Sequence, residues 1–494
     1  MSTPGVARGG FFFSLAFALL ASAAMIVALN LTMPWVMILM VLMATVFLAP
    51  VLVWARANLT FFFLCGFVFA IPIELTKAFV LAEFRNGMLL EYVSFADVFA
   101  FLTVASWLGG VLFSRSGRIA VDGLVWPYLG LVGWSLATLI VAENPVYGLN
   151  YASPFVKWLA IFIAASNILD SKKRIKAALF VLVLGVLFQC GYALVQTGLR
   201  AELGMQGVKT TMMGRYLEFG TGHKQLLRST GTTTHPNILA FYLVGCTPLF
   251  LSIALVRDTK WSERTVFLSM VVVAMIGLVL TYTRAGWISF AAALAAICFF
   301  AVRRHWIDPR VVPRVFAAAA VLVLLLFPYW QPVLWRLTKP DDQSANSRLF
   351  MTQQALMIIA DRPFSGIGLG GYQEANKLYV PEGKAALSAA LAEEMRGAIV
   401  HNRYLGVCAE TGVPGLLFLL WLLISLLRRA YANLAARDEY LGRLSLGLLG
   451  AVTGMCVFFA FDHCMDITRN QVFWLIAALV VAIRRLRDSE GSVA

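Results

Sequence analysis

The chain has 494 residues, of which 60% are hydrophobic and only 13% are charged. A soluble globular protein is closer to about 45–50% apolar and 25% charged, so this composition excludes a soluble enzyme as well as a disordered or fibrous chain. It predicts an all-α integral membrane protein. The formal net charge of +14 is explained most simply by basic cytoplasmic loops, and no nucleic acid partner is expected.

Fourteen segments contain the roughly 20 mainly apolar residues that a transmembrane helix needs. The first could be a signal peptide, but only Arg8 precedes it and another span follows at once, so we interpret it as an anchor. The segments at 59–76 and 153–169 are the weakest and could be re-entrant. The predicted polytopic bundle comprises residues 11–30, 34–54, 59–76, 95–113, 122–142, 153–169, 176–198, 236–256, 265–282, 286–302, 314–330, 413–428, 443–461 and 470–484.

Lysine and arginine gather in alternate connections between these spans. More than half of the 40 basic residues lie in one set of mostly short connections. The positive-inside rule assigns this set to the cytoplasm, so both termini should face the cytoplasm. Two long connections, 199–235 and 331–412, then face outward, and connections of this length are usually functional or disordered.

The longer outward connection contains two helix-like stretches, 348–363 and 384–400, on either side of the glycine-rich turn 366-GIGLGG-371. Apolar residues recur there at helical spacing, so we expect a large, partly helical cap that packs on the membrane domain. We therefore divide the chain into N-terminal membrane helices (1–120), a membrane core (121–330) with its loop 199–235, the cap (331–412), and C-terminal helices with a cytoplasmic tail (413–494).

Four of the five histidines fall on the outward side of this topology, namely His223, His235, His401 and His463. His401 opens the segment 401-HNRYLGVCAETGVPG-415, which leads into the span at 413–428. An imidazole at a membrane boundary beneath a cap could act as a general base near neutral pH. The alternative is an interfacial histidine that hydrogen bonds to a backbone carbonyl.

Two arginines on the same side are candidates for anion binding. Arg284 lies in 281-TYTRAGW-287, a tight turn between two spans, where an arginine is costly unless it reaches the interface or an anionic partner. Its planar fork suits phosphate oxygens. Arg348 begins the first helix-like stretch of the cap. The alternatives are an interfacial anchor for Arg284 and a solvated surface charge for Arg348.

The loop 199–235 ends in 228-RSTGTTTHPN-237, which is rich in hydroxyl groups and precedes a span. Free N–H groups at a helix N-terminus favour an anion, and Arg228, with Arg215 and Lys224 nearby, would reinforce that preference. Helix capping alone is the alternative explanation for the threonines and the asparagine.

Several kinds of chemistry have no matching motif. The sequence contains no Asp-x-Asp pair, no zinc-protease or serine-hydrolase motif and no Walker sequence, so no metal, cofactor or ATP is expected. The run 366-GIGLGG-371 follows no predicted strand and is rejected as a dinucleotide loop. A reaction on the outer face would have to use an already activated substrate.

The motifs together resemble the O-antigen ligase and polymerase superfamily. The segment from His401 fits a pattern of His-Asn, then nine residues, then Gly-x-x-Gly, in which the two glycines are Gly412 and Gly415. Three further motifs of the chain also resemble the family, namely 281-TYTRAGW-287, 228-RSTGTTTHPN-237 and 362-RPFSGIGLGG-371. The resemblance covers roughly residues 120–485. It implies a GT-C-like helical fold of usually twelve spans, in a bacterial inner-membrane glycosyltransferase whose active site is periplasmic.

Such enzymes take glycan from an undecaprenyl-diphosphate carrier. A ligase passes it to a lipid A-core sugar and a polymerase passes it to another carrier-linked repeat. The resemblance implies that His401 activates the acceptor hydroxyl and that Arg284 and Arg348 bind the donor diphosphate, in a metal-independent, inverting transfer. From its place in the loop, Arg228 is expected to bind the diphosphate with them. Supporting roles would fall to Arg215, His235 and Asn402. The family's Arg-x3-Leu element departs slightly here, with Ile288 following Arg284.

Two other classes of function compete with this interpretation. A transporter or flippase predicts charged residues in mid-span and paired broken helices, and the sequence shows few of the former and no matching pair of the latter. A scaffold for envelope assembly would explain the cap but not the arginines and the histidine.

Overall fold

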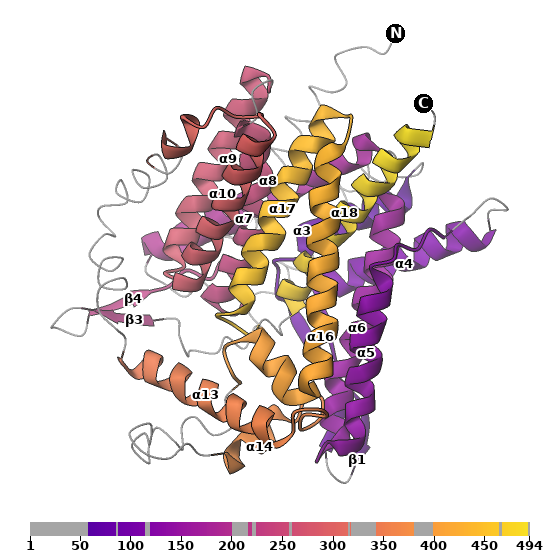
Figure 1. Ribbon diagram of the computed structural model, residues 1–494, viewed down its shortest axis with the longest axis vertical. Coiled ribbons are helices and arrows are strands. Elements are labelled where there is room, and N and C mark those ends of the chain that lie inside the picture. Colours follow the sequence, from indigo (N-terminus) through magenta and orange to yellow (C-terminus); the bar gives the residue numbers. More distant parts are fainter. Residues whose placement is uncertain are drawn as a thin grey trace, which may run out of the picture.

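The computed structural model shows a bundle of long helices with two short hairpins (Figure 1), which confirms the predicted all-α class. It describes residues 58–84, 87–113, 119–199, 216–219, 224–255, 259–314, 317, 342–379, 399–463 and 467–492. The helices of the bundle are α3 (Leu59–Ala70), α4 (Phe95–Phe113), α5 (Val125–Ala137), α6 (Pro145–Ile168), α7 (Lys172–Leu199), α8 (Pro236–Leu255), α9 (Trp261–Leu280), α10 (Arg284–Arg303), α16 (Arg403–Ala432), α17 (Glu439–Phe459) and α18 (Ile467–Ser492).

Within the described residues, seven helices are long and apolar enough to cross a membrane, which confirms a polytopic membrane protein. They are α4, α7, α8, α9, α10, α16 and α17. Four further predicted spans correspond to α3, α5, α6 and α18. The predicted spans 11–30, 34–54 and 314–330 lie outside the described residues, so the total of fourteen stays a prediction.

The prediction was wrong about the segment that follows α3. We expected a span over 59–76, but α3 ends at Ala70, because Pro72 has no N–H to continue the helix. The chain then forms an antiparallel hairpin from β1 (Thr76–Phe84) and β2 (Gly87–Ser94). A second hairpin, β3 (Tyr216–Phe219) with β4 (Lys224–Leu227), lies within the loop 199–235 and was also not predicted.

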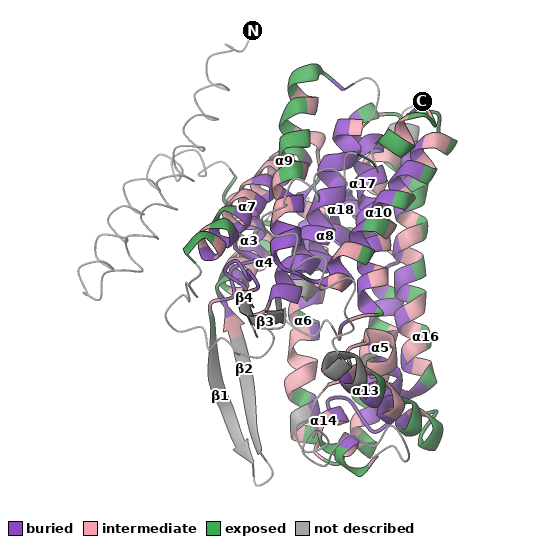
Figure 2. Cartoon of the chain, turned by 90° about the vertical axis from the view of Figure 1, so that its left-hand side faces the viewer, coloured by how far each residue is buried: buried purple, intermediate pink, exposed green. Residues whose placement is uncertain are grey.

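The core lies around α8, which is buried over almost its whole length. A helix that is apolar on every side belongs in the interior of a bundle, and α8 packs against α17, α9 and α10. Figure 2 shows the buried residues gathered on α8, α17 and α18, at the centre of the bundle. α4 is largely exposed and apolar, as expected of a helix that faces lipid.

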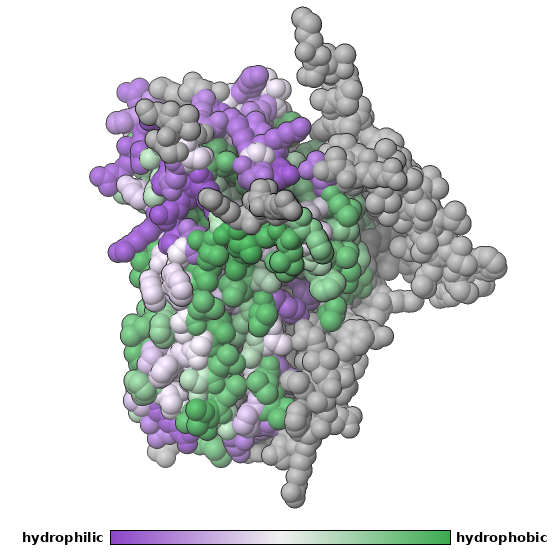
Figure 3. Space-filling view, turned by 90° about the vertical axis from the view of Figure 1, so that its right-hand side faces the viewer, coloured by the Kyte–Doolittle hydropathy of each residue, from purple (hydrophilic) through white to green (hydrophobic). Residues whose placement is uncertain are grey.

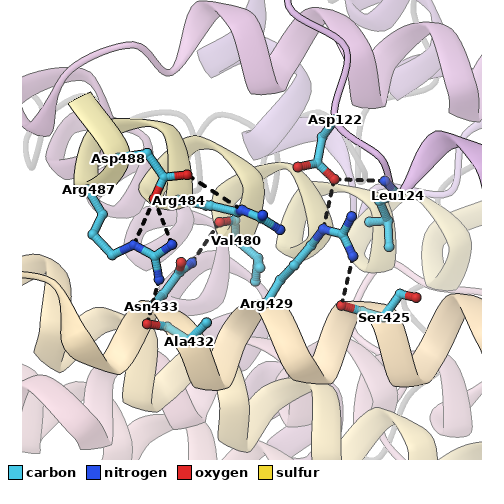
Figure 4. A network of polar contacts seen from close by, with 10 residues as sticks. All are labelled: Asp122, Leu124, Ser425, Arg429, Ala432, Asn433, Val480, Arg484, Arg487 and Asp488. Atoms are coloured by element: carbon cyan, nitrogen blue, oxygen red, sulfur yellow. Dashed lines mark hydrogen bonds and ion pairs between the residues drawn. The ribbon is translucent and has the colours of Figure 1, made fainter. Parts of the chain in front are cut away.

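Hydrophilic side chains gather at the end of the bundle that carries the C-terminus, above a hydrophobic middle (Figure 3). Arginines there hold the helices together (Figure 4). Nε of Arg429 on α16 donates to Oδ1 of Asp122 at 2.8 Å, and the same oxygen accepts the N–H of Leu124 just before α5. Arg487 on α18 donates to the carbonyl of Ala432 at 2.6 Å. Both arginines belong to the set that the positive-inside rule assigns to the cytoplasm.

The described part of the cap lies at the opposite end (Figure 1) and contains α13 (Asp342–Asp361), α14 (Tyr372–Ala375) and the 3₁₀ turn η3 (Asn376–Leu378). The helix predicted at 348–363 is therefore confirmed, whereas most of 384–400 lies outside the described residues. A small separate core joins the cap to the start of α16, and it consists of Met351, Ala355, Ile358, Ile367, Tyr372, Val400 and Ala409.

The glycine-rich turn of the cap forms backbone hydrogen bonds with a kink in α16. Gly412 has φ 70° and ψ −178° inside that helix, a conformation that is essentially restricted to glycine. Pro414 has no N–H for the carbonyl of Glu410, and the N–H of Gly368 occupies that carbonyl instead, at 2.9 Å. The carbonyl of Ala409 accepts the N–H of Ile367 at 3.0 Å. The cap thus satisfies the backbone groups that the kink exposes.

Replacing Gly412 with alanine should destabilise the protein by at least about 2 kcal/mol, because the residue has a glycine-only conformation and the new Cβ would fall on the carbonyl oxygen of Phe364. Thermal unfolding in detergent measures this change. Gly133→Ala is the matched control, since nothing lies within 4 Å of its new Cβ and alanine suits a helix better than glycine. Equal melting temperatures for the two variants would contradict the role of the kink.

Candidate active site

His401 lies at the junction between the cap and α16. Val400 before it is buried in the cap core, and Asn402 after it is the N-cap of α16, where its Oδ1 accepts the N–H of Leu405 at 3.0 Å. The side chain of His401 is 36% exposed. Capping explains why asparagine follows the histidine, and Asn402 fixes the start of α16 directly after His401.

Asp462 faces His401 from the segment after α17. Its carboxylate is only 1% exposed, and Oδ1 lies 3.6 Å from Nδ1 of His401 and 3.0 Å from Nδ1 of His463. The rings of His401 and His463 lie edge to face with centroids 5.7 Å apart. The side chains of these three residues therefore form one cluster. In each of them, one nitrogen or oxygen atom that could bind a metal ion lies within 4.8 Å of those of the other two.

A chain of hydrogen bonds leads from Asp462 to the turn before α10. Nδ2 of Asn237, near the start of α8, donates to Oδ2 of Asp462 at 2.7 Å. Oδ1 of Asn237 accepts from Nη2 of Arg228 at 3.0 Å and from Oγ1 of Thr283 at 3.2 Å. Thr283 immediately precedes Arg284, so the network holds that arginine's turn in a fixed position relative to Asp462 and His401.

Arg228 is itself part of this scaffold. It is 6% exposed, and its Nε donates to the carbonyl of Thr281 at 3.0 Å while Nη2 also reaches Oγ1 of Thr283 at 3.1 Å. A buried guanidinium with these contacts is better suited to positioning the turn than to binding a substrate directly. Its burial therefore favours a positioning role for Arg228 over the donor-binding role expected from the sequence.

The hydroxyl-rich segment 229–235 is fixed by protein contacts. Two glutamines of α7, Gln189 and Gln196, accept the backbone N–H groups of Thr232, Thr230 and Gly231. Oε2 of Glu74 accepts both the N–H and the hydroxyl of Thr234, at 2.6 and 2.7 Å. These contacts favour a structural role for the threonines over direct binding of an anion, as the capping alternative predicted.

The predicted site residues come from several elements at the same end of the bundle. Arg284 is the first residue of α10. Arg348 lies on α13, whose Met351, Ala355 and Ile358 share the cap core with Val400, the neighbour of His401. Nδ1 of His235 accepts the N–H of Asn237 at 3.1 Å, so it orients the residue that holds Asp462. Arg215 lies outside the described residues.

A small pocket opens beside His463. It has a cavity volume of about 20 Å³ and is lined by residues of the cap, α6, α16 and the segment after α17, among them Tyr151, Tyr372, Gln373, Arg403, Glu410 and His463. The backbone N–H groups of Gly370 and Tyr372 hydrogen bond to the Glu410 carboxylate. Burial, with a smaller contribution from the negative charge of Glu410, holds the pKa of Tyr372 well above its usual value, so its hydroxyl stays a donor, here to the carbonyl of Met351.

This arrangement contains the parts of a general base. In such an arrangement, a carboxylate that hydrogen bonds to Nδ1 can orient an imidazole, while Nε2 remains for a substrate. The 3.6 Å between His401 and Asp462 is longer than a hydrogen bond, although such contacts often shorten only when substrate is bound.

The residues around His401 were not identified from the sequence as its neighbours. Asp462 and His463 lie in a short connection between two spans, and an Asp-His pair on the outward side was the available signal. Asn237 was recognised only as a candidate cap. Glu410 lies within the quoted segment 401–415, but it was not singled out. Contact between these positions, which are far apart in the chain, could not be read from spacing.

Residues 268–420 match a family model described as O-antigen ligase. The match spans α9, α10, the cap and the first part of α16, and so includes Arg284, Arg348 and His401. The match covers less than half of the chain and agrees with the resemblance expected from the sequence. It supports the O-antigen ligase and polymerase superfamily and an O-antigen ligase-like function in polysaccharide assembly. No match to a curated protein accompanies it.

Proposed function

We propose that this protein belongs to the O-antigen ligase and polymerase superfamily and transfers glycan from an undecaprenyl-diphosphate carrier to an acceptor hydroxyl at the periplasmic face of the bacterial inner membrane. The observation that carries the proposal is His401 beside the buried Asp462, which Asn237 and Arg228 connect to the turn that presents Arg284. The basic end of the bundle, which carries the C-terminus, is opposite to the cap and therefore faces the cytoplasm in this topology. The alternation of basic connections in the sequence puts the N-terminus on the same side.

Arg284 and Arg348 bind the donor diphosphate. A sugar diphosphate leaves readily if its growing negative charge is neutralised as the anomeric bond breaks, and two guanidinium groups provide fixed electrostatic stabilisation for that charge. Arg228 keeps the turn before Arg284 in position.

His401 removes the proton from the acceptor hydroxyl as its oxygen attacks the anomeric carbon. The new glycosidic bond forms on the face opposite to the departing diphosphate, so the anomeric configuration inverts. Asp462 stabilises the imidazolium that results. The carrier diphosphate leaves with the electron pair of the broken bond, and neither ATP nor a nucleotide sugar is needed.

The family description, O-antigen ligase, favours lipid A-core as the acceptor. A polymerase of the same superfamily would use another carrier-linked repeat instead. Deleting the gene in its host distinguishes the two enzymes. Loss of a ligase leaves polymeric carrier-linked glycan that never reaches lipid A, whereas loss of a polymerase leaves single repeats.

Purified protein in detergent, supplied with carrier-linked glycan and lipid A-core, should form the glycosylated acceptor. Sealed vesicles that contain the protein should not move the glycan lipid from one leaflet to the other faster than protein-free vesicles. Transport without transfer would reject the enzyme and support a flippase.

Transfer should survive EDTA, because the proposed charge stabilisation comes from Arg284 and Arg348 rather than from a bound ion. Initial rates with excess EDTA and after dialysis should stay within about twofold of the untreated rate. Activity that disappears with EDTA and returns with an added divalent ion would contradict the two-arginine mechanism.

A further inference from the structure

The two imidazoles beside Asp462 present an unusual pair of nitrogen atoms. Nδ1 of His401 and Nδ1 of His463 are both buried and have no hydrogen-bond partner within the described part of the chain. Both lie close to the same carboxylate oxygen, Oδ1 of Asp462, at 3.6 and 3.0 Å. Two buried imidazole nitrogens around one carboxylate oxygen form a ligand set for an ion, and the general-base role of His401 gives no function to Nδ1 of His463.

We infer that His401, His463 and Asp462 bind a divalent transition ion of the zinc type, and that the bound ion inhibits glycan transfer. Two imidazole nitrogens and one carboxylate are ligands that Zn²⁺ and Co²⁺ accept, whereas Mg²⁺ and Ca²⁺ prefer oxygen. Bonds of about 2.0–2.1 Å to a tetrahedral ion separate neighbouring ligand atoms by roughly 3.4 Å, which is close to the two distances observed. The fourth position stays open to water.

The surroundings of Asp462 support such a site. Its second oxygen, Oδ2, accepts Nδ2 of Asn237 at 2.7 Å, and a hydrogen bond of this kind fixes the orientation of a ligating carboxylate. Oδ1 also accepts the N–H of His463 at 2.8 Å, which fixes the position of this oxygen beside the two imidazoles.

Inhibition follows from where the ion would sit. An ion on Nδ1 of His401 separates the imidazole from Asp462, so the carboxylate no longer orients the base or stabilises its protonated form. A neutral imidazole that binds an ion through Nδ1 carries its proton on Nε2, so no lone pair remains there to accept the acceptor proton. This consequence rests on the proposed function, whereas binding of the ion does not.

Titration of the purified, metal-free protein with Co²⁺ tests the site directly. We expect saturable visible absorption at one ion per chain, which Zn²⁺ displaces. His463→Asn and Asp462→Asn should each weaken Co²⁺ binding at least about tenfold, since loss of even a second-shell partner costs about 10–100-fold. His305→Asn is the matched control, because His305 lies beyond α10 at the other end of the bundle and has φ 56°, which asparagine tolerates.

Transfer assays provide the second readout. Zn²⁺ should inhibit the wild-type protein reversibly, with the rate restored by EDTA, and His463→Asn should need at least about tenfold more Zn²⁺ for the same fractional inhibition of its own metal-free rate. No saturable Co²⁺ signal, or equal weakening by His305→Asn, would overturn the site. Binding without inhibition would overturn the inhibitory role. If Co²⁺ binds as expected but the metal-free protein transfers no glycan, the proposed function fails and the metal site stands.

Discussion

Replacing His401 with alanine is expected to reduce glycan transfer by about 10²–10⁴-fold, the usual contribution of a general base. The acceptor hydroxyl would then lose its proton only to water, while Asp462 would have no catalytic imidazole to orient. The single-turnover rate with saturating donor measures the loss. Donor affinity should change little, because the diphosphate is bound by the arginines.

A matched pair of variants separates this effect from a general loss of histidine. His401→Asn should be as inactive as His401→Ala, whereas His305→Asn, at the opposite end of α10, should keep the wild-type rate. Unchanged membrane insertion and melting temperature would show that the His401 variants are folded. Wild-type transfer by folded His401→Ala would refute the base assignment.

Replacing Arg284 with alanine is expected to weaken donor binding about 10–100-fold, since a hydrogen bond to a charged group contributes about 1.5–3 kcal/mol. Acceptor affinity should stay nearly unchanged, because the acceptor approaches from the side of His401. Equilibrium binding of carrier-linked glycan and of acceptor, measured separately on the same protein, resolves the two effects. Arg284→Lys should recover part of the affinity, since it keeps the charge but loses the planar fork.

Arg304→Ala is the control for Arg284→Ala. It removes an exposed arginine next to the other end of α10 and should leave both affinities at their wild-type values. Equal donor affinity for Arg284→Ala and the wild-type protein would show that this arginine is an interfacial anchor, which was the alternative from its position alone.

The sequence predicted the bundle well because lipid restricts what can cross a membrane. A span needs a long apolar segment, so α7, α8, α9, α10 and α17 were found within a few residues of their observed ends. The hairpins β1–β2 and β3–β4 were missed, since short connections outside the membrane carry no such length requirement. Pro72 indicated that α3 ends early, but a span that is predicted from hydropathy alone takes no account of proline.

The candidate site was only partly predictable. His401 and Arg284 were recognised from short motifs, but the sequence could not show that Asp462 lies beside His401 or that Asn237 connects it to Arg228. The segment 366-GIGLGG-371 was rejected as a dinucleotide loop, but the sequence did not predict that it contacts the kink at Gly412. That contact is seen only in the hydrogen bonds that the carbonyls of Ala409 and Glu410 accept. Such contacts depend on packing between distant segments, which periodicity does not encode.

Thiol labelling tests most directly whether the donor binds beneath the cap on the outer side. Gln373→Cys places a thiol in the pocket beside His463, and Arg437→Cys places one between α16 and α17, at the basic end. In cells with a permeabilised outer membrane, an impermeant maleimide should label Gln373→Cys above the wild-type background, and added carrier-linked glycan should slow that labelling. Arg437→Cys should react only after the inner membrane is disrupted. Labelling of Gln373→Cys only after disruption, or at a rate that the donor does not change, would contradict an outward-facing donor site.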